Sequence, residues 1–192
     1  MKLRESGMPD EVWWESLFDV PLILDRLGIH PEIGDVVELG CGYGTFTIPV
    51  ARRIRGRVFA FDVDADMVVR AQRRAREAGL TNVLCQQRDV VETGYGMPHQ
   101  SVDGCLLFNI LHSEDPINLL GQAAALVRPG GRIWAIHWRC DPATPRGPSM
   151  GIRPRPEQIA DWAGATGMLE RVGNLVDLPP WHYGWRIRKL AG

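Results

Sequence analysis

Three glycines, Gly40, Gly42 and Gly44, lie within five positions directly after a mostly apolar run. A residue without a Cβ leaves space beside the main chain, so a ligand can approach the backbone of this segment closely. A carboxylate, Asp62, ends the next apolar run of the chain. An acid about 20 residues after a glycine turn is placed to accept hydrogen bonds from ribose hydroxyls. The two features together predict the binding of an adenosine-type cofactor.

The spacing of the glycines distinguishes between two kinds of adenosine cofactor. A dinucleotide fingerprint, G-x-G-x-x-G, needs its last glycine at the start of a helix that receives a pyrophosphate. Here the glycines follow the pattern G-x-G-x-G, and Thr45 stands where the last glycine of that fingerprint is expected. The pattern disfavours a pyrophosphate ligand, so an NAD-dependent oxidoreductase remains only as the weaker alternative.

The segment from Glu38 to Gly44 resembles the first motif of the class I S-adenosylmethionine-dependent methyltransferases, a strand followed by E/D-x-G-x-G-x-G. In that family the glycine turn faces the methionine part of the cofactor. Four further matches follow in the family's order: Asp62 with the segment 64–67, a strand ending at Asp89, a strand ending at Asn109, and the turn Pro129-Gly130-Gly131 before a fifth strand. Each match alone is weak, but five in order over residues 36–138 are highly specific.

The resemblance implies S-adenosylmethionine as the cofactor. It also implies the residues that hold this cofactor: Glu38, Gly40, Cys41, Gly42, Gly44, Asp62, Val63, Met67, Asp89, Val90 and Asn109. In the family's arrangement, Asp62 would hold the ribose, Met67 would pack on the adenine and Asp89 would accept from its amino group. The implied activity is the transfer of a methyl group to a nucleophilic O, N, C or S atom of an acceptor.

Three histidines are candidates for catalysis or for contact with the acceptor. Ligands of open α/β sheets collect outside the carboxyl ends of the strands, and His112, His137 and His182 are all predicted near such ends. A neutral histidine could act there as a general base. Each has a plainer alternative: His112 as a capping or surface residue, His137 in the core, and His182 in a turn stiffened by two prolines.

Aromatic side chains are the candidates for the wall of the acceptor site, namely Trp14, Trp138 and Tyr183. Trp13 and Trp14 would form a lid, or simply pack as part of a helix on the domain. The proline-rich loop 141–156 is also expected near the acceptor, because loops of about 15 residues without regular structure are often functional.

Composition limits the size of the core and the kinds of partner that the chain can be expected to bind. A chain of 192 residues with 45% hydrophobic residues can bury one sizeable core, and a net charge of −1 gives no strong attraction for nucleic acid. No apolar run approaches the roughly 20 residues that span a bilayer, and no targeting segment is recognisable. The four cysteines form no C-x-x-C pair and are read as small buried side chains, and no metal-ligand spacing occurs. A cytoplasmic protein without a metal is therefore expected.

The acceptor is predicted to be a small molecule, because the chain looks most like the branch related to the quinone methyltransferases. The Asn-Pro-Pro-Tyr signature of base methylation is absent after Asn109. A non-catalytic S-adenosylmethionine-binding regulator stays as an alternative, since a fold does not guarantee an activity. The oligomeric state is left open, with a homodimer among the options.

Alternating strands and helices predict an α/β protein with a single doubly wound, Rossmann-like domain. The resemblance implies a sheet of seven mostly parallel strands in the order 3-2-1-4-5-7-6, ending in an antiparallel hairpin. Residues 1–34 are predicted as a helical cap of this domain, and residues 35–192 as its S-adenosylmethionine-binding methyltransferase part. Strands are expected at 36–39, 57–61, 83–87, 101–109, 132–138, 169–173 and 183–189, and helices at 11–18, 20–27, 45–54, 65–78, 116–126 and 156–165.

Overall fold

The computed structural model describes residues 7–191, so the first six residues of the predicted cap lie outside the described part, as does Gly192. The strands form one eight-stranded sheet in the order β3-β2-β1-β4-β5-β8-β6, with β7 also pairing with β8. The strands are β1 Val36–Leu39, β2 Val58–Asp62, β3 Val83–Gln87, β4 Val102–Phe108, β5 Val127–Trp138, β6 Leu169–Arg171, β7 Val176–Leu178 and β8 His182–Lys189.

The predicted order is confirmed, with the predicted seventh strand corresponding to β8. Strands β1 to β5 are parallel, and β8 runs antiparallel to β5, β6 and β7. The expected number of strands was one too small, because the three-residue strand β7 is too short to show an alternating pattern. It forms because β8 offers an edge with unpaired backbone groups beyond β6.

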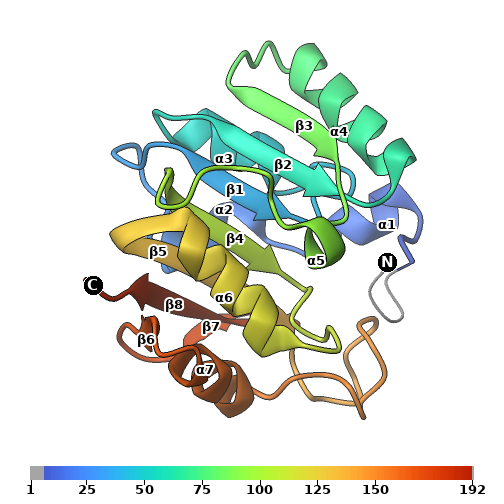
Figure 1. Ribbon diagram of the computed structural model, residues 1–192. Coiled ribbons are helices and arrows are strands. Elements are labelled where there is room, and N and C mark those ends of the chain that lie inside the picture. Colours follow the sequence, from blue (N-terminus) through green and yellow to red (C-terminus); the bar gives the residue numbers. More distant parts are fainter. Residues whose placement is uncertain (1–6, 192) are drawn as a thin grey trace.

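Residues 7–191 form seven helices (Figure 1): α1 Glu11–Glu15, α2 Val20–Leu27, α3 Thr47–Arg53, α4 Ala65–Glu77, α5 Val90–Thr93, α6 Pro116–Leu126 and α7 Pro156–Ala165. Helices α2, α3 and α4 pack on one face of the sheet, and α5, α6 and α7 on the other. Within residues 7–191, none of these helices has the length and apolar character that crossing a membrane requires.

Most expected helices agree with the structure to within two residues, but α1 and α5 differ more. Helix α1 stops at Glu15 rather than at Phe18, because Leu17 and Phe18 turn into the core, where they are 5% and 9% exposed. Helix α5 was not predicted between β3 and β4. It forms as one short turn because the Asp89 carboxylate caps it, accepting from Glu92 N at 3.2 Å.

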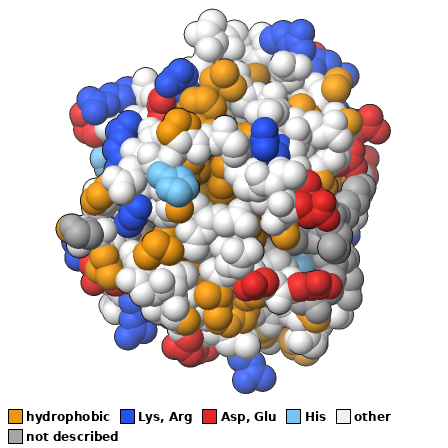
Figure 2. Space-filling model, in the orientation of Figure 1, with side chains coloured by type: hydrophobic (Ala, Val, Ile, Leu, Met, Phe, Trp, Pro, Cys, Tyr) orange, Lys and Arg blue, Asp and Glu red, His pale blue; other side chains and the backbone are white. Residues whose placement is uncertain are grey.

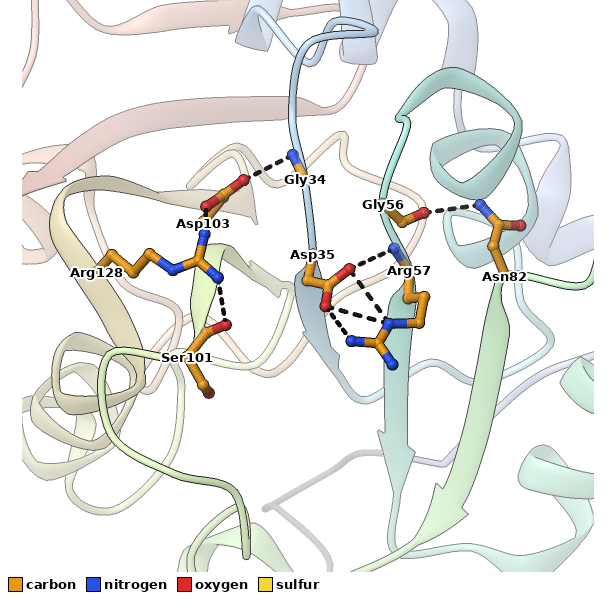
Figure 3. A network of polar contacts seen from close by, with 8 residues as sticks. All are labelled: Gly34, Asp35, Gly56, Arg57, Asn82, Ser101, Asp103 and Arg128. Atoms are coloured by element: carbon orange, nitrogen blue, oxygen red, sulfur yellow. Dashed lines mark hydrogen bonds and ion pairs between the residues drawn. The ribbon is translucent and has the colours of Figure 1, made fainter.

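Polar contacts connect the amino ends of the parallel strands, at the opposite end of the sheet from their carboxyl ends (Figure 3). The Asp35 carboxylate accepts from the backbone N–H and the guanidinium of Arg57, which joins β1 to β2. Asp103, at the start of β4, accepts from Gly34 N at 2.7 Å and from Arg128 of β5. The positions of the strands are thus fixed at this end by side chains, which leaves the carboxyl ends to build a site.

The segment around α1 is held on the sheet by arginines of α4. Arg74 Nη1 lies 3.3 Å from Glu11 and 2.5 Å from Glu15, and Arg70 Nη1 lies 3.3 Å from Glu11. The side-chain hydroxyl of Tyr43, within the glycine turn, donates to the Pro9 carbonyl at 2.6 Å. The residues before α2 therefore form a cover over the glycine turn.

Candidate functional site

A cavity of about 190 Å³ lies at the carboxyl ends of the parallel strands. Figure 1 shows the arrowheads of β1, β2 and β4 converging on this side, where α1, α5 and the loop after β5 also gather. The glycine turn and the tips of β2 and β4 form its floor, while residues 7–14 and 146–148 contribute to its cover. This is the position at which open α/β sheets bind ligands.

The glycine turn has a conformation that side chains rarely tolerate. Gly40, Gly42 and Gly44 have φ angles of 76°, 51° and 81°, in the left-handed region that favours glycine. The N–H groups of Gly40 and Cys41 donate to the Phe61 carbonyl at 2.7 and 3.0 Å, which fixes the turn to the end of β2. Gly40 and Gly42 line the cavity, whereas Gly44 and Cys41 do not.

Asp62 holds the turn from the second strand. Its Oδ2 accepts from Gly42 N at 2.9 Å, and its Oδ1 accepts from Asp64 N at 2.9 Å. Burial raises the pKa of Asp62, and these two backbone hydrogen bonds oppose the shift. The carboxylate lines the cavity and retains further lone pairs for a ligand, since an ionised carboxylate can accept about four hydrogen bonds.

Glu38, the acid of the first motif, points away from the cavity. Along β1, Val37 and Leu39 pack on the α6 face, so the alternation of the strand turns Glu38 to the opposite face, toward α3. There its Oε2 accepts from the Thr47 hydroxyl at 2.5 Å, and the side chain is only 2% exposed. Burial raises the pKa of Glu38 to about 8, although the Thr47 hydrogen bond opposes the shift.

This buried carboxyl gives a prediction about stability and pH. Between its ordinary pKa of 4.5 and its folded pKa of about 8, the unfolded chain ionises Glu38 while the folded chain keeps the proton. The free energy of unfolding should therefore fall as the pH rises across this window, by up to about 1.4 kcal/mol per pH unit. Glu38→Gln cannot ionise and should lose this part of the slope.

The measurement is urea unfolding of the wild type and Glu38→Gln between about pH 5 and pH 8. The variant is expected to gain stability relative to the wild type as the pH rises. Asp62 titrates in both proteins and cancels from the difference. Parallel curves over the whole range would show that Glu38 is not held as the neutral acid.

Asn109 combines an unusual backbone with an unsatisfied side chain. It follows β4 with φ at 58°, which is uncommon for a residue other than glycine, and its N–H donates to the Ile136 carbonyl at 2.8 Å. Both its amide oxygen and its amide nitrogen are buried without a hydrogen-bond partner among residues 7–191, and the residue lines the cavity. Unpaired buried polar atoms are costly, and strained backbone clusters at ligand sites, so this amide is suited to bind a polar ligand.

Two of the three candidate histidines are in contact. His137 Nε2 lies 3.4 Å from His112 Nδ1, and His137 Nδ1 accepts from Trp138 N at 3.0 Å. Burial, followed by the neighbouring His112, lowers the pKa of His137 well below its usual range, so His137 is neutral. With Nδ1 occupied as an acceptor, a neutral His137 carries its proton on Nε2 and offers it to His112 Nδ1. A neutral His112 then carries its own proton on Nε2.

Only His112 of the three lines the cavity. His137 is fully buried behind it. His182 lies between aromatic rings, with centroids 4.6 Å from Phe18 and 4.1 Å from Trp138, and burial lowers its pKa to about 3. It is an uncharged part of the aromatic packing under the site.

The loop between β5 and α7 is organised by one buried arginine. Arg153 is 8% exposed, and its guanidinium donates to the carbonyls of Arg139 at 2.8 Å and Pro148 at 2.8 Å. Gly147 has φ at 128°, and a Cβ there would lie 2.9 Å from Trp138 Cγ, so the loop packs tightly on the end of β5. This arrangement presents Arg146 to the cavity.

The structure brings together part of the predicted site. Of the residues expected to hold a cofactor, the cavity includes Gly40, Gly42, Asp62, Val63, Met67, Asp89, Val90 and Asn109, but not Glu38, Cys41 or Gly44. Of the acceptor candidates, Trp14 and Trp138 line it. Tyr183 does not, because its hydroxyl donates to the Pro154 carbonyl at 2.7 Å beneath the loop.

Sequence reasoning missed several lining residues, above all Met8, Phe108 and Arg146. Phe108 ends a predicted strand, and the expectation that the loop 141–156 lies near the acceptor was the signal that pointed toward Arg146. Within residues 7–191, no group of three or more histidines, cysteines or acids is placed to hold a metal ion.

Comparison with known proteins identifies the family to which the chain belongs. A family model described as "Methyltransferase domain" matches residues 36–131, which run from the start of β1 through the Pro-Gly-Gly turn inside β5. A crystal structure of a SAM-dependent methyltransferase from Aquifex aeolicus has a TM-score of 0.81 at 22% identity, covering 94% of each chain. At that identity the likeness shows a shared fold.

Curated relatives include proteins with very different acceptors. The chain is 29% identical over 127 residues to the aklanonic acid methyltransferase DauC of Streptomyces sp. (strain C5), covering 57% of each protein. It is 32% identical over 127 residues to the 23S rRNA (uracil(1939)-C(5))-methyltransferase RlmD of Alcanivorax borkumensis, covering 65% of this chain and 27% of the relative. The chain thus spans between about a quarter and about half the length of these relatives. Their names leave the acceptor of this protein open.

Proposed function

The chain belongs to the methyltransferase domain family of class I, S-adenosylmethionine-dependent enzymes, and from this premise we propose that it methylates a nucleophilic O, N, C or S atom of a small-molecule acceptor. The observation that carries the proposal is the cavity at the strand tips, in which a left-handed glycine turn, three carboxylates and an amide without a partner among the described residues face one space.

The residues present fit the cofactor. Asp62, at the tip of β2, would accept from the ribose hydroxyls, and Asp89, at the end of β3, would take the adenine amino group. Met67 and Val90 also line the cavity and would supply apolar contact to the adenine. The buried amide of Asn109, which lacks a partner within the described chain, would gain one from the amino-acid part of the cofactor. When bound, the cofactor supplies a methyl group activated on a sulfonium.

The chain itself would contribute to methyl transfer mainly by positioning the acceptor and by excluding water. Phe108, Trp14 and Trp138 form an apolar wall beside His112, and the cover over the glycine turn closes the space. Holding an acceptor in line with a reactive atom can contribute roughly 7–11 kcal/mol to lowering a barrier. With its Nδ1 facing Nε2–H of His137, a neutral His112 would offer its own Nε2–H to the acceptor as a donor. We therefore assign His112 to orienting the acceptor, and His137 to fixing the His112 tautomer.

The enclosure and charge of the site favour a small acceptor over a nucleic acid. Within the described chain, the lining of the cavity contains a single cationic side chain, Arg146, whereas phosphate tracking needs many. On the face seen in Figure 2, lysine and arginine side chains are scattered and do not form a continuous basic patch. The formal net charge of −1 agrees with this.

The direct test compares ligands by calorimetry and thermal shift. S-adenosylhomocysteine and S-adenosylmethionine should bind, and at about 100 times the dissociation constant each should stabilise the fold by about 2.7 kcal/mol. NAD should leave the stability unchanged. Stabilisation by NAD alone, or by none of the three, would contradict the proposal.

Transfer is tested separately, by incubating cell extracts with methyl-labelled S-adenosylmethionine and the enzyme. A labelled metabolite that requires the enzyme is the expected result. Binding without any labelled product would instead favour the regulatory alternative, since the fold by itself does not supply the reaction.

A further inference from the structure

Among the residues that the structure describes, Arg146 is the one arginine that lines the cavity. Its guanidinium donates to the Gly7 carbonyl and lies over the rings of Trp13 and Trp14, 5.9 Å from each centroid. Within residues 7–191 it has no carboxylate partner, whereas Arg74 pairs with Glu15 and Arg139 with Asp177. It therefore brings to the cavity wall a positive charge that forms no ion pair with a described carboxylate.

The surroundings of Arg146 favour an ion pair between its guanidinium and an anion. Arg146 is partly buried, and burial lowers its pKa, which means that water compensates its charge less well than at the surface. A guanidinium stays protonated in proteins and has a planar fork that matches a carboxylate in a bidentate pair. Such a pair gains strength where water is partly excluded.

The loop that carries Arg146 is arranged before any ligand binds. Arg153 donates to the Pro148 carbonyl through two nitrogens, at 3.1 and 2.8 Å, and to the Arg146 carbonyl at 3.4 Å. The close approach of Gly147 to Trp138 leaves little freedom for the backbone between them. A preorganised cation loses less entropy on binding than one on a mobile side chain.

The space beside Arg146 is aromatic. The rings of Trp14 and Trp138 meet edge to face with centroids 6.1 Å apart, and Phe108 completes the wall. The acids Asp62 and Asp89 lie at the part of the cavity assigned to the adenosine group. The cavity thus has carboxylates that can bind the cofactor, and an arginine and aromatic rings that can bind an acceptor.

Building on the proposed function, we infer that the acceptor is a carboxylic acid with a planar, apolar body, whose carboxylate pairs with Arg146 while its body packs against Trp14 and Trp138. The cation selects the charge of the acceptor, and the tryptophans select its shape. This assignment accounts for an arginine that has no acidic partner among the described residues and is nonetheless held firmly at an apolar site.

The experiment uses the full chain saturated with S-adenosylhomocysteine and probes it with indole-3-acetate and 4-hydroxybenzoate and with their primary amides. Affinities are measured by calorimetry, or by saturation-transfer NMR where binding is weak. The proteins are the wild type, Arg146→Gln, and the control Arg171→Gln. Arg171 also lies 5.9 Å over a tryptophan ring, that of Trp185, but outside the cavity, so the control changes charge and stacking alike.

In the wild type and in Arg171→Gln, at least one carboxylate should bind about tenfold or more tightly than its amide. In Arg146→Gln this preference should fall below about twofold. The absence of a preference in the wild type, or its survival in Arg146→Gln, would overturn the inference.

A second arm separates the acceptor from the cofactor, which carries a carboxylate of its own. S-adenosylhomocysteine and 5′-methylthioadenosine, which lacks that carboxylate, are titrated into the wild type and Arg146→Gln. We expect both affinities to change less than about threefold. A selective loss for S-adenosylhomocysteine would assign Arg146 to the cofactor and overturn the inference. A wild type that binds neither nucleoside would instead refute the proposed function itself.

Discussion

Asp62→Asn should weaken the binding of S-adenosylhomocysteine by about 100-fold, which corresponds to about 2.7 kcal/mol. The carboxylate holds Gly42 N and Asp64 N, one on each oxygen. An asparagine has one acceptor oxygen, so its NH₂ group would face one of these N–H donors and displace it. Hydrogen bonds to charged groups contribute about 1.5–3 kcal/mol each, and the ribose would lose its acceptor as well.

Isothermal titration of both proteins measures this effect, and Asp66→Asn is the matched control. Asp66 is exposed in the first turn of α4, four positions from Asp62, and does not line the cavity. The control should retain the wild-type affinity within about twofold. Equal affinities in Asp62→Asn and the wild type would remove Asp62 from the cofactor site.

Arg153→Gln should lower the free energy of unfolding by about 2–4 kcal/mol and open the loop 139–153 to proteases. The wild-type guanidinium satisfies the carbonyls of Arg139, Arg146 and Pro148, and glutamine has too few donors and too short a reach to replace it. The carbonyls that lose their donor must reach water, which requires the loop to leave the end of β5.

Urea unfolding and limited proteolysis with mass mapping follow this variant, with Arg132→Gln as the control for the loss of one charge. Arg132 is exposed on β5 and does not line the cavity. The affinity of Arg153→Gln for S-adenosylhomocysteine should change less than about threefold, because the loop lies on the acceptor side. A variant as stable and as resistant to proteolysis as the wild type would show that the loop holds its place without Arg153.

These two substitutions probe different halves of the cavity. Asp62 acts through the glycine turn, which comes from one short stretch of chain, whereas Arg153 acts through a loop that follows the last parallel strand. A cofactor defect in one variant and a loop defect in the other would separate cofactor binding from the shaping of the acceptor site.

The sequence by itself determined the frame of the protein. The G-x-G-x-G spacing and the acid at position 62 were readable because each depends on residues close together in the chain, whereas the order of the strands followed from the resemblance to a family with the same sequence of motifs. Helices α2 and α6 begin and end where their capping aspartates, their prolines and their last apolar residues predict. The alternation along β1 also fixes the face of the sheet on which Glu38 lies, but the motif placed this residue among those that hold the cofactor, and the structure leaves it out of the cavity lining.

Only the tertiary structure decided which side chains share the cavity. His112, His137 and His182 are equivalent as sequence signals, yet packing leaves only His112 at the cavity wall. Arg146 reaches the Gly7 carbonyl from 139 positions away, and no local pattern records such a contact. The residues at the end of a strand determine locally where the chain turns. Whether two loops far apart in the sequence come into contact depends instead on how the whole core packs beneath them, and a local sequence pattern holds no information on that packing.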